Sequence, residues 1–361
     1  MEYIFGYPGG AALHIYDSIF NQKEMQHILV RHEQGATHAA DGYARATGKP
    51  GVVLVTSGPG ATNAITGIAT AFMDSIPMVI ISGQVQSHLI GTDAFQETDM
   101  IGVSRPIVKH SFTVDKQENI ANIVAEAFHI ATSGRQGPVL IDVPKDLTNP
   151  DELFDFVYPD KVHIRSYNPP TKPENHQVSR AVDAILASER PVIYAGGGTI
   201  SSNASKELRE LNDLIDAPVT NTLMGLGVFP GTHKRFLGML GMHGTYQANM
   251  AMHNADLIIA LGARFDDRIT NAPDKFAPRA KVIHFDVDHS SVSKIIEADI
   301  AVFGQIKDSL QAINNHLKTK IDEIDNEKLA PWHQQISDWK EKHGLNHDSV
   351  SYTHLTLPTK R

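Results

Sequence analysis

The sequence predicts an α/β protein built from two doubly wound parallel-sheet domains. Short, β-branched, nearly all-apolar runs alternate with helical patterns from the first residues, as is typical of parallel strands covered on both faces. The alternation stops at a proline-rich stretch and then begins again, which indicates a second domain of the same kind. With 361 residues, the chain is long enough for two or three domains.

The first domain is expected over residues 1–148. Ala36, Ala40 and Ala44 share one face of a helix that should stop at Gly48, and a further helix is expected over 61–73. The expected strands are 3–7, 28–31, 52–56, 78–82 and 139–143.

Five prolines among polar and tyrosine residues predict an ordered linker over 149–175, before a second domain over 176–320. That domain is expected to contain helices 178–187, 201–215 and 307–318 and strands 191–195, 257–261 and 282–287. The remainder, 321–361, is charged and is expected to be an irregular linker to a third domain absent from this chain. Its last part, 351–361, has no core pattern and is expected to be a non-native tail.

The composition excludes several classes of function. A net charge of −9 with scattered basic residues argues against binding to nucleic acid or to an anionic membrane. The absence of cysteine excludes disulfides, thiolate metal sites and a cysteine nucleophile, and it fits a reducing cytosol. No apolar stretch reaches the roughly 18 residues that a membrane-spanning helix needs, and the dispersed histidines predict no metal site.

Glu33 is the most informative single residue. The run 27–33 predicts a short buried strand with a polar tip, followed by a helix that opens at 34–35. Ligands of open α/β sheets bind at the carboxyl ends of the strands, and the glycine-rich turn 56–63 after the next strand is expected beside Glu33. A carboxylate facing such a turn suits a thiamine-type cofactor, whose aminopyrimidine must be protonated to generate its ylid. Taken alone, an acid at this position is more often an ordinary acid in the first turn of a helix.

Seven motifs carry a resemblance to the thiamine-diphosphate enzymes and, among these, to the acetohydroxyacid synthase (acetolactate synthase) catalytic-subunit family. GTDAFQE and RFDDR are the most specific of them, whereas SGPG or GGG alone is a weak signal. The motifs are YPGGA at 7–11, RHEQG at 31–35, TSGPGATN at 56–63, GTDAFQE at 91–97, GPVLIDVPK at 137–145, GMHG at 241–244 and RFDDR at 264–268.

The resemblance implies roles for residues of the first domain. Glu33 would hydrogen-bond the aminopyrimidine of thiamine diphosphate so that the cofactor's own nitrogen removes its C2 proton, with Gln96 beside it as a second catalytic residue. Alternatively, Gln96 is an exposed loop amide and Lys145 an ordinary surface lysine. The implied positions are Pro59 and Asn63 at the cofactor, and Gly10, Ala11, Gln86, Phe95 and Lys145 along the substrate channel.

In the second domain the resemblance implies a largely structural FAD. Gly196, Gly197 and Gly198 follow a strand and open a helix, so their amides could meet an anion. Gln305 stands where the family usually has aspartate, which puts one FAD contact in doubt, and the aspartates could instead be helix caps. The other implied contacts are Arg135, Thr222, Leu223, Met242, His243, Gly262, Arg264, Asp266, Asp267, Asp286 and Val287.

The implied function is thiamine-dependent decarboxylation of pyruvate and its carboligation to a second 2-keto acid, pyruvate or 2-ketobutyrate, in branched-chain amino acid biosynthesis. The family binds Mg²⁺ and the diphosphate through a GDG…N motif in a third domain, and no GDG occurs here, so this chain alone is expected to be inactive. The alternatives are another thiamine enzyme, such as pyruvate oxidase or glyoxylate carboligase, and an inactive FAD-binding or assembly module.

The resemblance also implies a homodimer or homotetramer, with a small regulatory subunit as a further partner. A bacterial cytoplasmic location is expected, with a plastid or mitochondrial origin left open.

Overall fold

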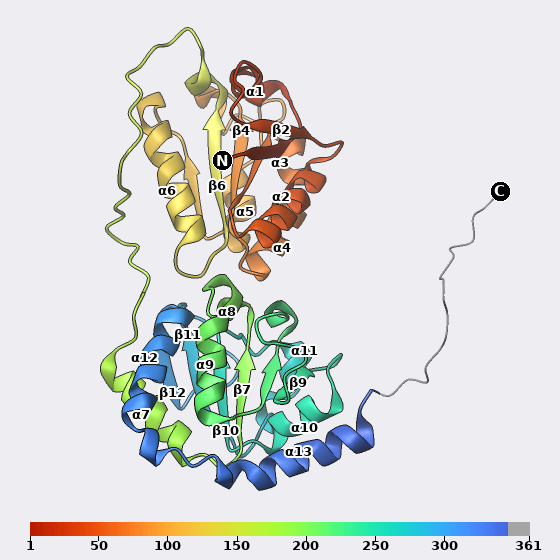
Figure 1. Cartoon of the computed structure of the whole chain (residues 1–361). Helices are drawn as coiled ribbons and strands as arrows, with labels where there is room; N and C mark the ends of the chain where they lie inside the picture. The colour runs from red at the N-terminus through yellow and green to blue at the C-terminus, as the bar shows by residue number, and fades with distance from the viewer. Residues whose placement is uncertain (346–361) are drawn as a thin grey trace, which may run out of the picture. The chain divides into compact units, whose positions relative to one another are not determined.

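The computed structural model describes residues 1–345, which form two compact units divided between Lys172 and Pro173 (Figure 1). Each unit holds one six-stranded sheet, and every strand pairing in both sheets is parallel. Helices cover both faces of each sheet, so the predicted fold class is confirmed. Within the described residues no helix is both long and apolar enough to cross a bilayer.

The first sheet has the strand order β2-β1-β3-β4-β6-β5. Its middle strands are apolar because both faces are covered, and Val53, Leu54 and Val55 have no exposed surface. The strands are β1 (Tyr3–Gly6), β2 (Gln26–Leu29), β3 (Gly51–Val55), β4 (Met78–Gln84), β5 (His110–Thr113) and β6 (Pro138–Pro144).

Two strands at the edges of this sheet differ from the predictions. β2 is not buried: it pairs only with β1, and Ile28 and Leu29 are 38% and 64% exposed. An edge strand has a neighbour on one side only, which leaves its apolar residues partly open. The opposite edge, β5, was not predicted because three of its four residues are polar.

The helices of the first unit lie in two layers (Figure 1). α1 (Leu13–Phe20) and α6 (Ile120–Thr132) pack on one face, where Ile15 and Ala127 join the same core as β-strand residues. α2 (Glu33–Thr47) and α4 (Ile65–Met73) cover the other face and pack against each other. The short helices are α3 (Pro59–Asn63) and α5 (Met100–Ser104).

The helix boundaries follow local backbone chemistry. α2 ends at the predicted position because Gly48 adopts the left-handed conformation, with φ of 70°. The helix predicted over 61–73 is interrupted at Ala64, which separates α3 from α4.

The second sheet has the order β12-β11-β10-β7-β8-β9. Its central strands β7 and β10 match the predicted ranges, whereas β8, β9 and β12 were not predicted, since each has only three or four residues. The strands are β7 (Pro191–Ala195), β8 (Val219–Asn221), β9 (Phe236–Met239), β10 (Leu257–Leu261), β11 (Lys281–Asp286) and β12 (Ile300–Phe303).

Two separate apolar clusters hold the helices of the second unit to its sheet. α7 (Asn175–Ala187), α9 (Ser205–Ile215) and α12 (Ile306–Thr319) cover one face, and α10 (Tyr246–Asn254) covers the other. The helix predicted over 201–215 is instead two, α8 (Gly197–Ser201) and α9, because Asn203 between them has a φ of 52°. A further short helix is α11 (Asp267–Thr270).

The prediction that the chain is irregular after residue 320 is wrong. α13 (Ala330–His343) is a regular helix whose Trp332 is 2% exposed and donates from Nε1 to the carbonyl oxygen of Pro191 at 3.2 Å. The pattern was missed because only Trp332 and Ile336 of this helix are buried. The tail predicted over 351–361 lies outside the described residues.

Candidate functional site

In the first unit, the candidate residues occupy the loops that leave the carboxyl ends of the parallel strands. Parallel strands direct those ends to one edge of a sheet, so the topology gathers the loops there. The positions are Gly10 and Ala11 after β1, Glu33 after β2, Pro59 and Asn63 after β3, Gln86, Phe95 and Gln96 after β4, and Lys145 after β6.

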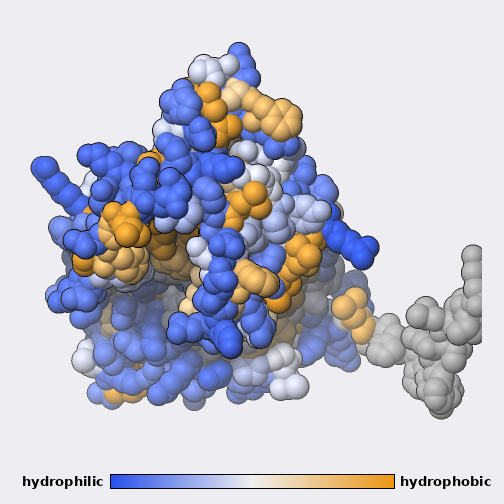
Figure 2. Space-filling model, turned by 90° about the horizontal axis from the view of Figure 1, so that it is seen from above, coloured by the Kyte–Doolittle hydropathy of each residue, from blue (hydrophilic) through white to orange (hydrophobic). Residues whose placement is uncertain are grey.

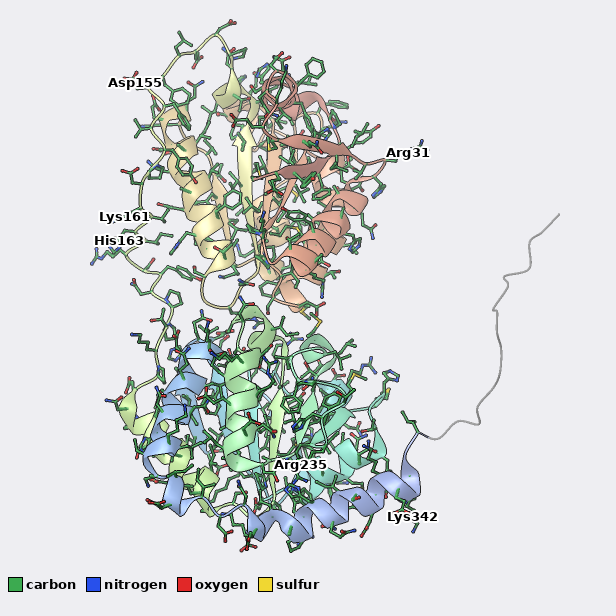
Figure 3. The ribbon with its side chains drawn as sticks, viewed as in Figure 1. Arg31, Asp155, Lys161, His163, Arg235 and Lys342 are labelled. Carbon is green, nitrogen blue, oxygen red and sulfur yellow. The ribbon has the colours of Figure 1, made fainter. Side chains whose placement is uncertain are left out.

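Glu33 is the first residue of α2 and is only 8% exposed. Asn63 donates from Nδ2 to Glu33 Oε2 at 3.0 Å, and a Cβ added at Gly60 would lie 3.2 Å from Glu33 Oε1. The structure thus places the glycine-rich turn against this carboxylate. Nearby Arg31 points away from the body of the unit (Figure 3).

The loop that carries Gln96 rests on the same turn. Gly58 has a φ of 56°, and a Cβ there would lie 2.6 Å from the carbonyl oxygen of Gln96, so only glycine permits this approach. Glu97 closes the loop because its carboxylate accepts the backbone N–H groups of Gly91 and Ala94. The side chain of Gln96 is exposed and has no hydrogen bond among the described residues.

The expected channel residues lie on loops that contact one another. Ala11 donates its N–H to Thr56 Oγ1 at 3.1 Å, and a Cβ on Gly83 would lie 3.0 Å from the Ala11 carbonyl carbon. Ser87, next to Gln86, donates to Asp146, next to Lys145, at 2.8 Å. Phe95 is 88% exposed, and the face seen from above mixes apolar and polar side chains without one continuous apolar patch (Figure 2).

Tyr16 is a neighbour of the site that sequence reasoning missed. Its hydroxyl donates to the carbonyl oxygen of Leu54 at 2.7 Å, and burial, together with the negative charge of Glu33, raises the pKa of Tyr16. A Cβ on Gly6 would lie 2.4 Å from this hydroxyl. Gly6, a glycine within a predicted strand, was therefore the one feature of the sequence that indicated this close approach of the Tyr16 hydroxyl.

In the second unit, the loops after all six strands carry candidate residues, again at one edge of a parallel sheet. They are Gly196, Gly197 and Gly198 after β7, Thr222 and Leu223 after β8, Met242 and His243 after β9, Gly262, Arg264, Asp266 and Asp267 after β10, Asp286 and Val287 at the end of β11, and Gln305 after β12.

The glycine run of this edge has a structural reason. A Cβ on Gly196 would lie 2.2 Å from the carbonyl oxygen of Gly262, and one on Gly198 would lie 2.8 Å from the Gly262 Cα. Close packing of two strand-end turns therefore requires these glycines with or without a bound anion, so the run by itself is weak support for a phosphate site.

Several polar side chains nevertheless line this edge. Asp286 is 8% exposed at the end of β11, and Gln305 Oε1 accepts the Ser202 hydroxyl at 3.1 Å. Asp266 Oδ2 lies 3.7 Å from Arg264 Nη2, and Asp266 Oδ1 accepts the Arg268 N–H. This hydrogen bond, together with the nearby cations, holds the pKa of Asp266 below its usual value. Such acceptors fit the hydroxyl groups of a nucleotide cofactor.

Three of the candidate side chains are exposed to solvent. Leu223 and Met242 are 69% and 64% exposed, and His243 is exposed as well. Arg135 belongs to the first unit, where its Nε donates to Ser75 Oγ at 2.9 Å. Among the described residues no group of three His, Asp or Glu side chains could hold a metal ion.

Comparison with family models identifies the two units. Residues 1–103 match the N-terminal TPP binding domain of thiamine pyrophosphate enzymes, and residues 178–313 match the central domain. The chain belongs to the thiamine pyrophosphate enzyme family.

Its curated relatives narrow the position within that family. The chain is 57% identical over 351 residues to the acetolactate synthase large subunit of Buchnera aphidicola (Acyrthosiphon pisum) and 52% identical over 351 residues to acetolactate synthase isozyme 3 large subunit of Escherichia coli. Each match covers 97% of this chain and 61% of the relative. The acetolactate synthase of Mycobacterium avium is 49% identical over 339 residues, which is 53% of its length.

Proposed function

We propose that the chain forms the N-terminal and central parts of an acetolactate synthase large subunit. The reaction is decarboxylation of pyruvate and joining of the product to a second 2-keto acid, pyruvate or 2-ketobutyrate. The observation that carries the proposal is the buried carboxylate of Glu33, held by Asn63 against the glycine-rich turn. Three relatives that bear the acetolactate synthase name support it.

The residues at the first edge fit the aminopyrimidine end of thiamine diphosphate. Asn63 satisfies one oxygen of Glu33, and the other faces Gly60, which has no side chain to block a ring. When bound, the cofactor supplies a carbon nucleophile stabilised by its own ring. Glu33 then holds a proton against the pyrimidine nitrogen, in a site from which burial excludes bulk water. On the loop over Gly58, Gln96 would lie near the cofactor and Phe95 would line the channel of the keto acid.

FAD, Mg²⁺ and partners belong to the same proposal. FAD would lie along the second edge, with Asp286 and Gln305 toward its adenosine end, and would act as a structural group. Mg²⁺ would accompany the diphosphate, for which this chain is expected to supply no ligand. A homodimer or homotetramer, a small regulatory subunit and a cytoplasmic location complete the proposal. The large-subunit names of bacterial relatives support the small subunit.

The test is Glu33→Gln in this chain joined in frame to the remaining segment of a relative. Glutamine keeps the size of the side chain but cannot share the proton, so both C2–H exchange of thiamine diphosphate and acetolactate formation should fall about 10²–10⁴-fold. Asp41→Asn is the matched control, because Asp41 is an equally buried acid of α2 that pairs with Arg45. Exchange at the parent rate in the Gln variant would show that Glu33 is a structural acid.

A further inference from the structure

Asp142 is a buried acid of β6 that has no part in the function proposed above. It is 3% exposed, its Oδ2 accepts Gln84 Nε2 at 3.0 Å, and its Oδ1 is buried without a hydrogen bond among the described residues. The Ser82 hydroxyl on β4 is close enough to favour the ionised form, while the negative charge of Asp99 opposes it. A buried acid without a nearby cation lowers the stability of the fold, so a role other than stabilisation must account for Asp142.

Asp142 fixes, together with the N–H of Val85 and the carbonyl oxygen of Thr98, which way the Gln84 amide points. An ionised carboxylate only accepts hydrogen bonds, so Nε2 of Gln84 must face it. Gln84 Oε1 then accepts the N–H of Val85 at 2.8 Å, and Nε2 also donates to the carbonyl oxygen of Thr98 at 2.9 Å. If the amide were reversed, all three contacts would be lost together.

The contact to Thr98 anchors the loop of residues 91–99. Thr98 lies two residues after Gln96, and Asp99 accepts the Gly102 N–H at 2.8 Å as the N-cap of α5. Gln84 therefore ties the end of β4 to the one loop that carries both Phe95 and Gln96. The turn at Gly58 supports this loop from the other side.

We propose that Asp142 is a positioning residue: by orienting the Gln84 side chain it holds loop 91–99, and with it Phe95 and Gln96, in place. The catalytic importance of that placement rests on the function proposed above, whereas the ordering of the loop does not.

The charge of Asp142 has two opposing effects on the loop. Burial, with Asp99 adding to it, raises the pKa of Asp142 to about 7. Ionisation strengthens the hydrogen bond from Gln84, but Asp99 belongs to the same loop and its charge repels the ionised group, so the role of Asp142 is tested by comparing variants at one pH. On the neighbouring strands, the groups nearest to Asp142 are uncharged: Ser82 and Gln84 on β4 and Thr113 on β5. His110 of β5 is paired with Val139, three residues before Asp142.

Hydrogen exchange measured by mass spectrometry on this chain tests the ordering. At pH 8, protection of the 91–99 peptide should be about tenfold lower in Asp142→Asn than in the parent, as expected for one pKa unit of differential interaction. Asparagine keeps the size of the side chain but is an uncharged and therefore weaker acceptor for Gln84 Nε2. Asp41→Asn, which alters a buried acid paired with a cation, should keep the parent behaviour.

Parent-like protection of the loop in Asp142→Asn would overturn the proposal. If that variant does not fold, Gln84→Met serves instead: it removes the amide, so the loop should be unprotected while β6 keeps its protection. Loss of protection in β6 as well would assign Gln84 to general stability and would also overturn the proposal.

In the completed enzyme, Asp142→Asn should lower kcat together with the protection of the loop, whereas Glu33→Gln should lower kcat and leave the loop protected. A loop that responds as expected in a protein without acetolactate activity would refute the proposed function and leave the role of Asp142 standing.

Discussion

At the residue scale, His284 is a titratable group deep in the second unit. It has no exposed surface, its ring packs edge-on against Phe265, and its Nε2 lies 3.8 Å from Asp286 Oδ2. Burial lowers the pKa of His284 to about 4. His333 on α13 is also shifted to about 4, by partial burial and by the nearby Arg235, which pairs with Asp216 and is labelled in Figure 3.

We predict that the second unit loses stability as the pH falls from about 6.5 to about 4. In this range the unfolded chain binds protons that the folded unit excludes, so each histidine contributes up to about 1.4 kcal/mol per pH unit. Above pH 6.5 the two contributions are constant. His284→Asn should reduce the slope, and His333→Asn should reduce it further.

Urea unfolding followed by tryptophan fluorescence measures this slope, because Trp332 and Trp339, the two tryptophans of the sequence, both lie on α13. His253→Asn, a change at an exposed position of α10, is the control and should leave the slope unaltered. An unchanged slope in both test variants would contradict the assigned pKa shifts.

At the element scale, α2 and α4 approach closely where Gly67 faces Thr37. Thr37 has no exposed surface, and a Cβ added at Gly67 would lie 2.0 Å from its Oγ1. Helices pack this closely only where one of them lacks a side chain, so Gly67 sets the distance between α4 and the helix that begins with Glu33.

We therefore expect Gly67→Ala to destabilise the first unit by about 1–3 kcal/mol through overpacking. Gly42→Ala is the matched control: Gly42 lies inside α2, is exposed, and has no atom within 4 Å of an added Cβ. That change should stabilise the unit by roughly 0.5–1 kcal/mol because alanine favours the helix. Hydrogen exchange of the β3 and β4 amides measures both effects, and equal effects of the two changes would refute the packing argument.

At the scale of the whole molecule, the chain repeats one architecture twice. Each unit has its own parallel sheet and its own apolar clusters, and in each the candidate residues follow the carboxyl ends of the strands. Ligands that bind one edge should therefore be detected as stabilisation of the unit that contains it.

We expect FAD to protect the amides of β10 and β11 from exchange, with a gain of RT ln(1+[L]/Kd), or about 2.7 kcal/mol at a hundredfold excess over Kd. Asp286→Ala should remove the gain, whereas Asp274→Asn, at an exposed position, should retain it. No added protection at millimolar FAD would refute the FAD assignment.

The sequence by itself determined the fold class and the edge at which the candidate residues lie. β3, β4, β6, β7 and β10 were predictable because strands covered on both faces must be apolar throughout, and Glu33 follows a strand whose carboxyl end must lie at the ligand-binding edge. Edge strands such as β2 and β5, and the half-exposed α13, lack that uniform pattern, so local sequence described them wrongly or not at all.

Only the tertiary structure decided which side chains meet. Glu33 contacts Asn63 although β1 lies between their two strands in the sheet, and Gln84 joins Asp142 to Thr98 across 58 and 14 positions of sequence. Such contacts depend on strand order, register and the distance between helices. These are properties of the packed core as a whole, because each results from many residues filling one volume together, and no short segment encodes them.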